Sequence, residues 1–228
     1  MRAVLLYHSV STTSSSRFSI DPAAFEKQMR WLSSRFRIVQ AGELLHALQK
    51  GGRDHLASVQ FDDGYRDNLT VMLPIIERLR VPVTVFLTTG LMGKTLRDRE
   101  MLTWDEAREI QASGLVEFGS HTHTHLLLDS AEAEAAREEI VLSKEIIEQE
   151  LGTPARFFTY PKGRICPETR EIVAAEFEGA FGGGNRAIGR QEDIFNIPRI
   201  SINQNTPFWK FRLTLNPLIW HVRQRYDL

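Results

Sequence analysis

Short apolar runs alternate with longer amphipathic segments along most of the chain. The apolar runs predict strands, and they fall at 3–7, 38–39, 56–61, 83–87, 116–119, 157–160, 179–181 and 197–200. The amphipathic segments predict helices. The first begins at residue 22, and the others lie over 43–49, 68–79, 104–114, 130–151 and 168–177. This alternation implies parallel strands joined by right-handed crossovers. Seven or eight such units over this length favour an α/β barrel rather than an open sheet.

Proline and capping residues indicate where two of the helices begin. Asp21 is a suitable N-cap, and Pro22 suits the first helical position. Pro74 fits poorly in the middle of the segment 68–79, because proline lacks the N–H group that a helix needs. We therefore expect a kink or a late helix start there.

Composition and charge restrict the class of protein. The 228 residues are 42% hydrophobic and 25% charged, which fits one soluble domain over 1–228 with a C-terminal helical segment over 206–228. The net charge of −1 argues against a nucleic-acid-binding protein. A single cysteine, Cys166, excludes an internal disulfide. No apolar run is as long as a membrane span, and the first residues lack the features of a secretory signal, so we expect a cytoplasmic protein.

Two adjacent carboxylates, Asp62 and Asp63, follow the apolar run 56–61. Consecutive side chains of a strand point in different directions, but both can reach one pocket where the backbone bends into a loop. One carboxylate could then hold a metal ion while the other takes a proton. The alternative is structural, since Asp63-Gly64 is a common turn sequence and Asp62 could cap the next helix.

Three of the seven histidines lie within five residues, directly after the strand 116–119. Histidine is a favoured ligand of zinc and similar ions, and three protein ligands with an open position are typical of a catalytic site. His121 and His125 are four residues apart and fall on the same side of a turn. We therefore assign these two as ligands and leave His123 outside the cluster. A histidine-rich polar loop, or an adventitious surface metal site, is the alternative.

These stretches resemble motifs of the polysaccharide deacetylases, carbohydrate esterase family four. Phe61-Asp62-Asp63-Gly64 and His121-Thr122-His123-Thr124-His125 are similar to the first two motifs of its nodulation-type catalytic domain. Further similar stretches follow the family's order, and they are Tyr7-His8-Ser9-Val10, Leu102-Thr103-Trp104-Asp105-Glu106, Phe158-Thr159-Tyr160-Pro161-Lys162-Gly163 and Ile197-Pro198-Arg199-Ile200. The resemblance runs from about Leu5 to near Leu215. It implies a single distorted (β/α) barrel with about seven parallel strands.

The resemblance also implies metal-dependent hydrolysis of an amide. It assigns Asp63, His121 and His125 as ligands of Zn²⁺, or of another divalent ion such as Co²⁺ or Ni²⁺. Asp62 is then the general base that deprotonates the attacking water, and the backbone N–H of Lys162 is the donor to the oxyanion. The residues expected to bind the substrate are Tyr65, Tyr160, His8 and Trp104. Two alternatives stay open, because Tyr160-Pro161-Lys162-Gly163 can be an ordinary turn and His8 can be a core histidine.

The chain departs from the family pattern at three places. Gln60 stands where threonine or serine usually begins the first motif. Thr159 stands where many members carry an arginine that contacts the base, so Arg199 is our candidate to pair with Asp62 and hold it ionised. A surface or barrel-end salt bridge of Arg199 is the alternative. The family's final Leu-x-His motif is missing after Ile200, which leaves the general acid open between His221, His8 and Asp62 acting twice.

The stretch 208–226 is rich in aromatic, aliphatic and basic residues. These are Phe208, Trp209, Lys210, Phe211, Arg212, Leu215, Leu218, Ile219, Trp220, Arg223, Arg225 and Tyr226. Such a composition is compatible with peripheral contact at the inner face of a membrane. Alternatively, the aromatic residues close the bottom of the barrel or pack a dimer. Pro217 interrupts any single amphipathic helix.

The predicted function is removal of an N-acyl group, with acetyl as the first expectation, from an amino sugar of a glycan or glycan precursor in surface polysaccharide synthesis. Deformylation of a formamido sugar needs the same chemistry. A barrel that only binds carbohydrate is the second hypothesis, suggested by the missing histidine and the altered third motif. The complete set of Asp62, Asp63, His121 and His125 favours the enzyme, because a pure binding protein has no need of a base beside a metal. The expected partner is an amino-sugar carbohydrate and not a nucleic acid.

Overall fold

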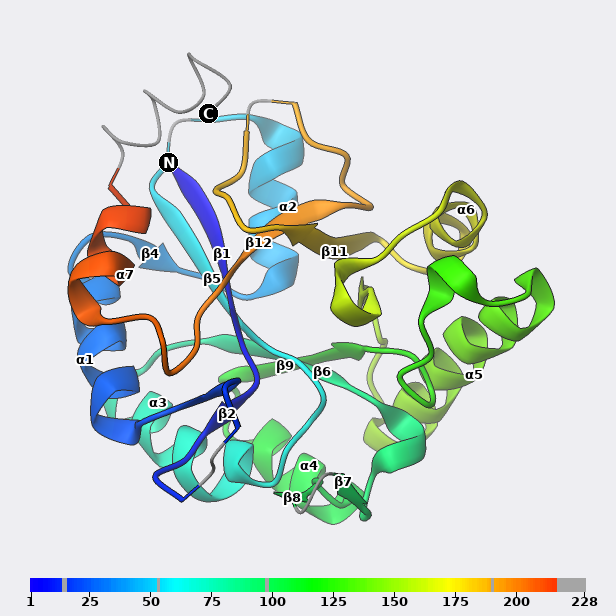
Figure 1. Ribbon diagram of the computed structural model, residues 1–228, viewed down its shortest axis with the longest axis horizontal. Coiled ribbons are helices and arrows are strands. Elements are labelled where there is room, and N and C mark those ends of the chain that lie inside the picture. Colours follow the sequence, from blue (N-terminus) through cyan, green and yellow to red (C-terminus); the bar gives the residue numbers. More distant parts are fainter. Residues whose placement is uncertain (14–15, 53, 97–98, 190, 217–228) are drawn as a thin grey trace.

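The computed structural model describes residues 1–216 apart from 14–15, 53, 97–98 and 190 (Figure 1). Parallel strands close into a seven-stranded barrel in which each strand pairs with the next one along the chain, and the last pairs with the first. In order they are β1 (Arg2–Tyr7), β5 (Leu56–Phe61), β6 (Val83–Leu87), β9 (Val116–Ser120), β10 (Phe157–Thr159), β11 (Gly179–Gly184) and β12 (Ile197–Ser201). A short strand, β4 (Arg37–Ile38), pairs with β5 from outside the ring. The predicted distorted (β/α) barrel is therefore confirmed.

The distortion of the barrel lies on one side. β1 and β5 pair along their full length, from Arg2–Leu56 to Tyr7–Phe61. By contrast, β9 and β10 share only the pair Ser120–Phe158, and the register of β11 against β12 shifts between Phe181 and Gly184. The irregular side is the one that carries the histidine loop and Arg199.

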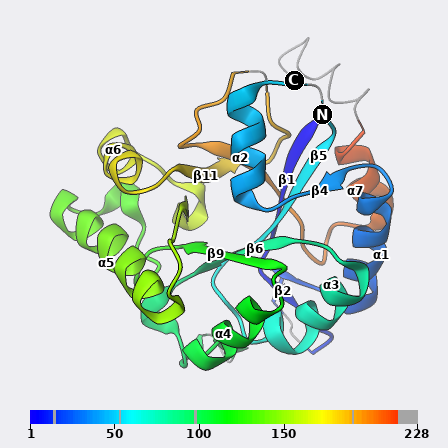
Figure 2. The ribbon, with the colours of Figure 1, turned by 180° about the vertical axis from the view of Figure 1, so that it is seen from behind.

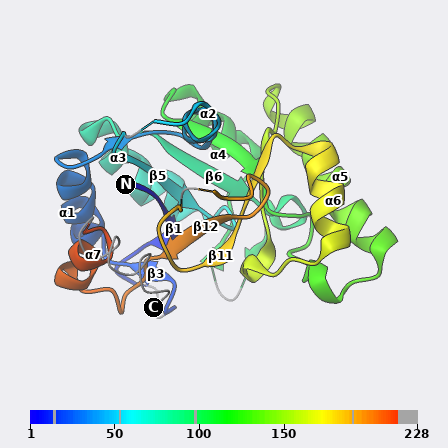
Figure 3. The ribbon, with the colours of Figure 1, turned by 90° about the horizontal axis from the view of Figure 1, so that it is seen from above.

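Helices surround the strands (Figures 1 and 2). Along the chain they are α1 (Pro22–Ser33), α2 (Ala41–Lys50), α3 (Leu73–Leu79), α4 (Trp104–Ala112), α5 (Ala133–Leu151), α6 (Pro167–Glu176) and α7 (Phe208–Thr214). Seen from above, α1 and α7 lie on one side of the barrel, and α5 and α6 on the other (Figure 3). Among the described helices, none combines the length and the apolar character needed to cross a bilayer.

The capping and proline signals have the expected effects. The Asp21 carboxylate accepts hydrogen bonds from the N–H groups of Ala23 and Ala24, so it caps α1 as predicted. A π-helical turn over Asn68–Met72 precedes α3, and Pro74 lies in the first turn of that helix. Its missing N–H is harmless in a first turn. The late start predicted from Pro74 is confirmed.

Some elements differ from the sequence prediction. β2 (Ser9–Val10) pairs with β3 (Ser19–Ile20), and β7 (Thr95–Leu96) forms a hairpin with β8 (Arg99–Glu100). Strands of two residues have no periodicity that a sequence pattern can reveal. α5 begins at Ala133 rather than at residue 130, because a 3-10 turn over Leu128–Ser130 and an extended stretch come first.

The alternating direction of the strand side chains separates an inner apolar cluster from two outer ones. One contains Val4, Leu56, Phe86, Phe157, Phe181 and Ile197. These residues come from strands around the whole barrel, so they fill its interior, and Leu44 and Leu45 of α2 pack against them. Neighbouring strand residues such as Leu5, Val59 and Val85 belong to a larger outer cluster with the helices α1 and α3. Phe158 and Ala180 belong to a smaller outer cluster with the helices α5 and α6. The strands are thus fixed from both sides, and their ends form a rigid base for the site.

Candidate active site

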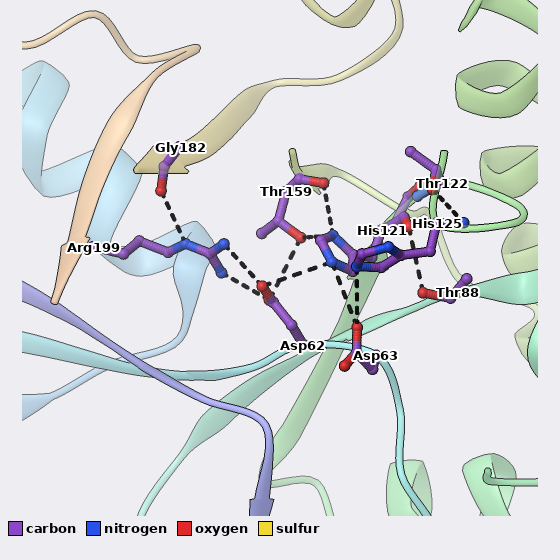
Figure 4. A network of polar contacts seen from close by, with 10 residues as sticks. Asp62, Asp63, Thr88, His121, Thr122, His125, Thr159, Gly182 and Arg199 are labelled. Carbon is purple, nitrogen blue, oxygen red and sulfur yellow. Dashed lines mark hydrogen bonds and ion pairs between the residues drawn. The ribbon is translucent and has the colours of Figure 1, made fainter. Parts of the chain in front are cut away.

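Side chains from four strands meet at the carboxyl-terminal end of the barrel (Figure 4). Asp62 and Asp63 follow β5, His121 follows β9, Thr159 ends β10, and Arg199 extends from β12. The carboxyl ends of parallel barrel strands lie at one end, which is where barrel enzymes place their active sites. Asp62 is 2% exposed and Arg199 is 3% exposed. Charges at this depth act on one another with little screening by solvent.

Asp62 and Arg199 form a buried bidentate ion pair. Nη1 of Arg199 donates to Oδ1 of Asp62 at 2.7 Å, and Nη2 donates to Oδ2 at 2.8 Å. Nε of Arg199 donates to the carbonyl of Gly182 at 3.3 Å, which orients the guanidinium. Burial alone raises the pKa of Asp62, but the charge of Arg199, followed by that of His121 and the hydrogen bonds from Arg199, lowers the pKa from 3.8 to about 2. The predicted pairing is present, and the carboxylate is ionised at neutral pH.

Asp63, His121 and His125 bring three potential ligand atoms together. Oδ1 of Asp63 lies 3.6 Å from Nε2 of His121 and 3.6 Å from Nε2 of His125. All three atoms lie within 4.8 Å of one another. Oδ1 is buried and has no hydrogen-bond partner among the described residues. A buried carboxylate oxygen facing two imidazole nitrogens suits a divalent ion of the zinc type, so the residues present fit the predicted metal.

Thr159 fixes the orientation of His121. Nδ1 of His121 lies 2.8 Å from the carbonyl oxygen of Thr159 and 2.6 Å from its hydroxyl. A carbonyl oxygen can only accept, so Nδ1 carries the proton and the lone pair of Nε2 faces Asp63. Burial lowers the pKa of His121, against the opposing effect of the Asp62 charge, and so favours the neutral ring that a metal ligand must have.

The rest of the histidine loop is held by residues outside the cluster. Nδ1 of His123 lies 2.8 Å from the hydroxyl of Thr89, so this ring is bonded elsewhere, as predicted. The carboxylate of Glu139 on α5 accepts hydrogen bonds from the N–H groups of His123 and Thr124, and from the hydroxyl of Thr124. Sequence reasoning missed Glu139. Glu139 is one of several glutamates on α5 and lies sixteen positions from His123, so the sequence gives no local signal of this contact.

A cavity of about 570 Å³ opens onto these residues. Its lining includes Asp62, Asp63, His121, His125 and Arg199, together with three of the other predicted residues, His8, Tyr65 and Lys162. It also includes Arg17 and Phe18, the leucines Leu91 and Leu96, and the glycine run 182–184. The cavity is large enough to hold a sugar residue.

Two predicted substrate-binding residues, Tyr160 and Trp104, do not line this cavity. Tyr160 is fully buried, its hydroxyl donates to the carbonyl of Phe195 at 3.0 Å, and its ring packs against Phe158. Alternation explains this, because Thr159 faces His121 and the next side chain must face the other way. Trp104 is the first residue of α4 and packs against the core rather than lining the cavity.

Tyr65 is held by a contact that the sequence did not reveal. The guanidinium of Arg99 on β8 lies 3.4 Å from the centre of the Tyr65 ring. Arg99 also pairs with the carboxylate of Asp67, which accepts a hydrogen bond from the Ser9 hydroxyl of β2. These contacts fix one wall of the cavity between β2 and the β7–β8 hairpin.

Lys162 occupies a tight turn after β10. Its backbone is left-handed, with φ of 57° and ψ of 15°, and it lies between Pro161 and Gly163. A Cβ on Gly163 would lie 2.5 Å from the nitrogen of Gly183, so only glycine lets this turn pack so closely on β11. A strained residue held by its surroundings at a cavity wall is often a functional one.

Comparison with known proteins extends these observations. The family model described as polysaccharide deacetylase matches residues 49–176. The poly-β-1,6-N-acetyl-D-glucosamine N-deacetylase of Staphylococcus aureus (strain MSSA476) is 24% identical over 213 residues, which cover 88% of this chain and 73% of that protein. The structure of IcaB from Ammonifex degensii matches with a TM-score of 0.81 at 25% identity, over 90% of this chain and 93% of that one. The Streptococcus pyogenes deacetylase PplD, in complex with acetate, shares the fold with a TM-score of 0.86 at 21% identity, over 94% and 98% of the two chains.

Proposed function

Since the chain belongs to the polysaccharide deacetylase family, we propose that it is a metal-dependent hydrolase that removes the N-acetyl group from an amino sugar of a glycan or glycan precursor. That it is a carbohydrate deacetylase follows from the family. The S. aureus relative is named for an N-acetylglucosamine polymer, which supports a polysaccharide, or a precursor of one, as the substrate here. A place in surface polysaccharide synthesis and a cytoplasmic location stay predictions.

The proposed metal ligands are Asp63, His121 and His125. Two neutral imidazoles and one carboxylate suit Zn²⁺, and also Co²⁺ or Ni²⁺. When bound, such an ion lowers the pKa of water and polarises the acyl carbonyl. Thr159 presets the His121 ring for this role, and Glu139 holds the loop that carries His125.

Asp62 is the proposed general base. It lies beside the ligand cluster, with Oδ2 at 3.8 Å from Nε2 of His121. Arg199 holds the carboxylate ionised and in a fixed orientation, so it is ready to accept a proton from the attacking water. The base and the ligand Asp63 are consecutive residues at a strand end, which lets the two carboxylates do different work in one cavity.

The proposed donor to the developing oxyanion is the backbone N–H of Lys162. Backbone donors fixed before the reaction stabilise such a charge without having to reorganise. Pro161 on one side, and the close packing of Gly163 on β11 on the other, keep this turn in a single conformation.

His8 is the proposed general acid for the leaving nitrogen. Three described histidines line the cavity, and two of them, His121 and His125, belong to the ligand cluster. His8 is the third. It follows β1, which pairs with β5, so it lies beside Asp62, and its ring packs against Phe18. The other candidate of the sequence analysis, His221, lies outside the described residues.

One observation carries the proposal. A buried, ionised Asp62 lies next to an Asp63 oxygen that has no hydrogen-bond partner among the described residues and that faces two imidazoles in an open cavity. A protein that only bound carbohydrate would gain nothing from this arrangement, which costs desolvation of both carboxylates.

The test is release of acid from defined substrates. The zinc-loaded protein is incubated with N-acetyl and N-formyl amino sugars, as oligosaccharides and as nucleotide-linked sugars, and acetate and formate are followed by proton NMR. We expect acetate from the N-acetylated substrates and its loss in Asp62→Asn. Formate instead of acetate would make the protein a deformylase with the same mechanism. No acid from any substrate, with metal bound, would overturn the hydrolase assignment, and equal release by Asp62→Asn would overturn the assignment of the base.

A further inference from the structure

Helix α7 has two different apolar faces, and only one is used by the fold. Phe211 and Leu215 are buried in the main core, where the Phe211 ring packs edge-on against Trp31 of α1 at 5.7 Å. Phe208 stacks on Phe211. Part of the C-terminal aromatic stretch thus packs into the core beside α1. The remainder, from Pro217 to Leu228, lies outside the described residues.

The other face of α7 is exposed. Trp209 is 65% exposed and Leu213 is 44% exposed, and across the described residues these are the exposed large hydrophobic side chains. They are four positions apart, so they lie on one face of the helix one turn apart. Exposed apolar side chains that lie side by side are typical of a surface that contacts a partner or a membrane.

A groove lies beside these residues, between α7 and α1, which are neighbours in Figures 1 and 3. Its volume is about 710 Å³. It is lined by Trp31, Arg35, Phe36, His55, Trp209, Arg212, Leu213, Leu215 and Asn216, with no acidic residue among them. Arg35, Lys210 and Arg212 form no ion pair with any described carboxylate, although many other arginines of the described chain do.

We propose that this face of α7, with Trp209 and Leu213 at its centre and Arg35, Lys210 and Arg212 around them, docks on an anionic lipid bilayer. Aromatic and aliphatic side chains that enter the interface, flanked by cations that meet anionic head groups, define this mode of binding. Charge selects this partner over a second copy of the chain. A symmetric dimer through the groove would oppose two groove linings that carry arginine and no carboxylate, whereas anionic lipid neutralises both the exposed and the groove-lining cations.

Docking in this way leaves the active site free. Phe36 directly precedes β4 and His55 directly precedes β5, so the groove opens at the amino-terminal end of the barrel. Asp62 and His121 lie at the carboxyl-terminal end. A bilayer on the α7 face would therefore hold the enzyme at the membrane with its cavity accessible to a glycan.

The experiment is flotation of the full chain with phosphatidylcholine vesicles, with and without phosphatidylglycerol. We expect binding only to the anionic vesicles, and weaker binding at high salt. The double variant Trp209→Ala/Leu213→Ala should lower the partition coefficient at least about tenfold. Arg212→Gln should lower it roughly fivefold. The matched control is Arg137→Gln, an exposed arginine of α5 on the other side of the barrel, which should bind as the unmodified chain does.

Three results would overturn the proposal. The first is no binding to anionic vesicles at low ionic strength. The second is equal binding by the double variant. The third is a concentration-dependent dimer, measured by light scattering, that the double variant abolishes while vesicles stay unbound; this would make a second copy the occupant. The variants lie outside the catalytic cavity, so all of them should release acid from soluble substrates at the unmodified rate, and failure of the docking proposal leaves the hydrolase proposal untouched.

Discussion

Replacing Arg199 by methionine tests the buried ion pair directly. The substitution removes both hydrogen bonds to Asp62 and leaves a carboxylate in a place where its side chain is only 3% exposed. The hydroxyl of Thr159 donates to Oδ1 of Asp62 at 3.5 Å, which is too long and too weak to replace a guanidinium. Loss of one partner from a buried pair costs about 3–5 kcal/mol. We therefore expect the free energy of unfolding of Arg199→Met to fall by about that amount at neutral pH.

The pH dependence of this loss has a definite sign. The pKa of Asp62 is lowered from 3.8 to about 2 in the folded protein, so its ionisation stabilises the fold above pH 3.8, and this contribution disappears as the pH falls through about 2. Without Arg199, burial is the largest influence left and raises the pKa of Asp62. The destabilisation of Arg199→Met should then be greatest at neutral pH and shrink as the pH falls through the raised pKa. The same protonation removes the proposed base, so acid release by the variant should decline at a higher pH than in the unmodified protein.

Urea unfolding in the presence of EDTA measures the loss of unfolding free energy without a contribution from bound metal. Acid release followed by NMR across pH measures the shift in the pH dependence of activity. The matched control is Arg156→Met. Arg156 also makes a bidentate pair, with Glu178 at 2.8 and 2.6 Å, but these side chains are 45% and 52% exposed. Its loss should cost about 0–1 kcal/mol. Arg199 does not hold Asp62 ionised if Arg199→Met is no less stable than Arg156→Met and its acid release declines at the same low pH as that of the unmodified protein.

Three further substitutions probe the ligand cluster, the acid and the loop. His125→Ala should lose bound zinc, measured by mass spectrometry of the metal, and EDTA treatment of the unmodified enzyme should abolish acid release until zinc is restored; zinc retained at full stoichiometry would contradict the ligand set. His8→Gln should lower kcat for amide substrates about 10²–10⁴-fold yet spare p-nitrophenyl acetate, whose leaving group needs no proton, and an equal loss on both would refute the acid role. Glu139→Gln should weaken zinc affinity about 10–100-fold in a competition titration, whereas Glu138→Gln, one position along α5 and exposed, should not; equal affinities would show that the loop needs no carboxylate.

Much of the fold follows from local patterns. The barrel strands are buried on both faces, so they read as apolar runs, and the order of runs and amphipathic segments gives parallel pairing. Pro74 even predicted the late start of α3. The β2–β3 and β7–β8 pairs could not be foreseen, because two-residue strands depend on contacts such as Arg99 with Asp67 that are remote in sequence.

The site was predictable where its residues sit at strand ends and carry distinctive chemistry. His121 and His125 could be separated from His123 by spacing alone. The pairing of Arg199 with Asp62 spans 137 residues, and it was expected because the family resemblance implies an arginine beside the base and Thr159 stands where that arginine usually lies. By contrast, Tyr160 and Trp104 do not line the cavity, because a motif gives the position of a residue and not the direction of its side chain. Alternation from Thr159 would have placed Tyr160 in the core.

Thr159 and Arg199 also bear on whether the site is that of an active enzyme. The resemblance implies an arginine at the position of Thr159 in many members of the family. The lack of that arginine here suggested a barrel that binds carbohydrate without catalysing a reaction. Here β10 supplies a carbonyl and a hydroxyl that orient His121, while β12 supplies the guanidinium that pairs with Asp62. Arginine at both positions would set two cations against one buried carboxylate, beside a cluster suited to a divalent ion, at a high desolvation cost. An uncharged residue at position 159 is therefore compatible with the Arg199–Asp62 pair, whose guanidinium comes from another strand, β12.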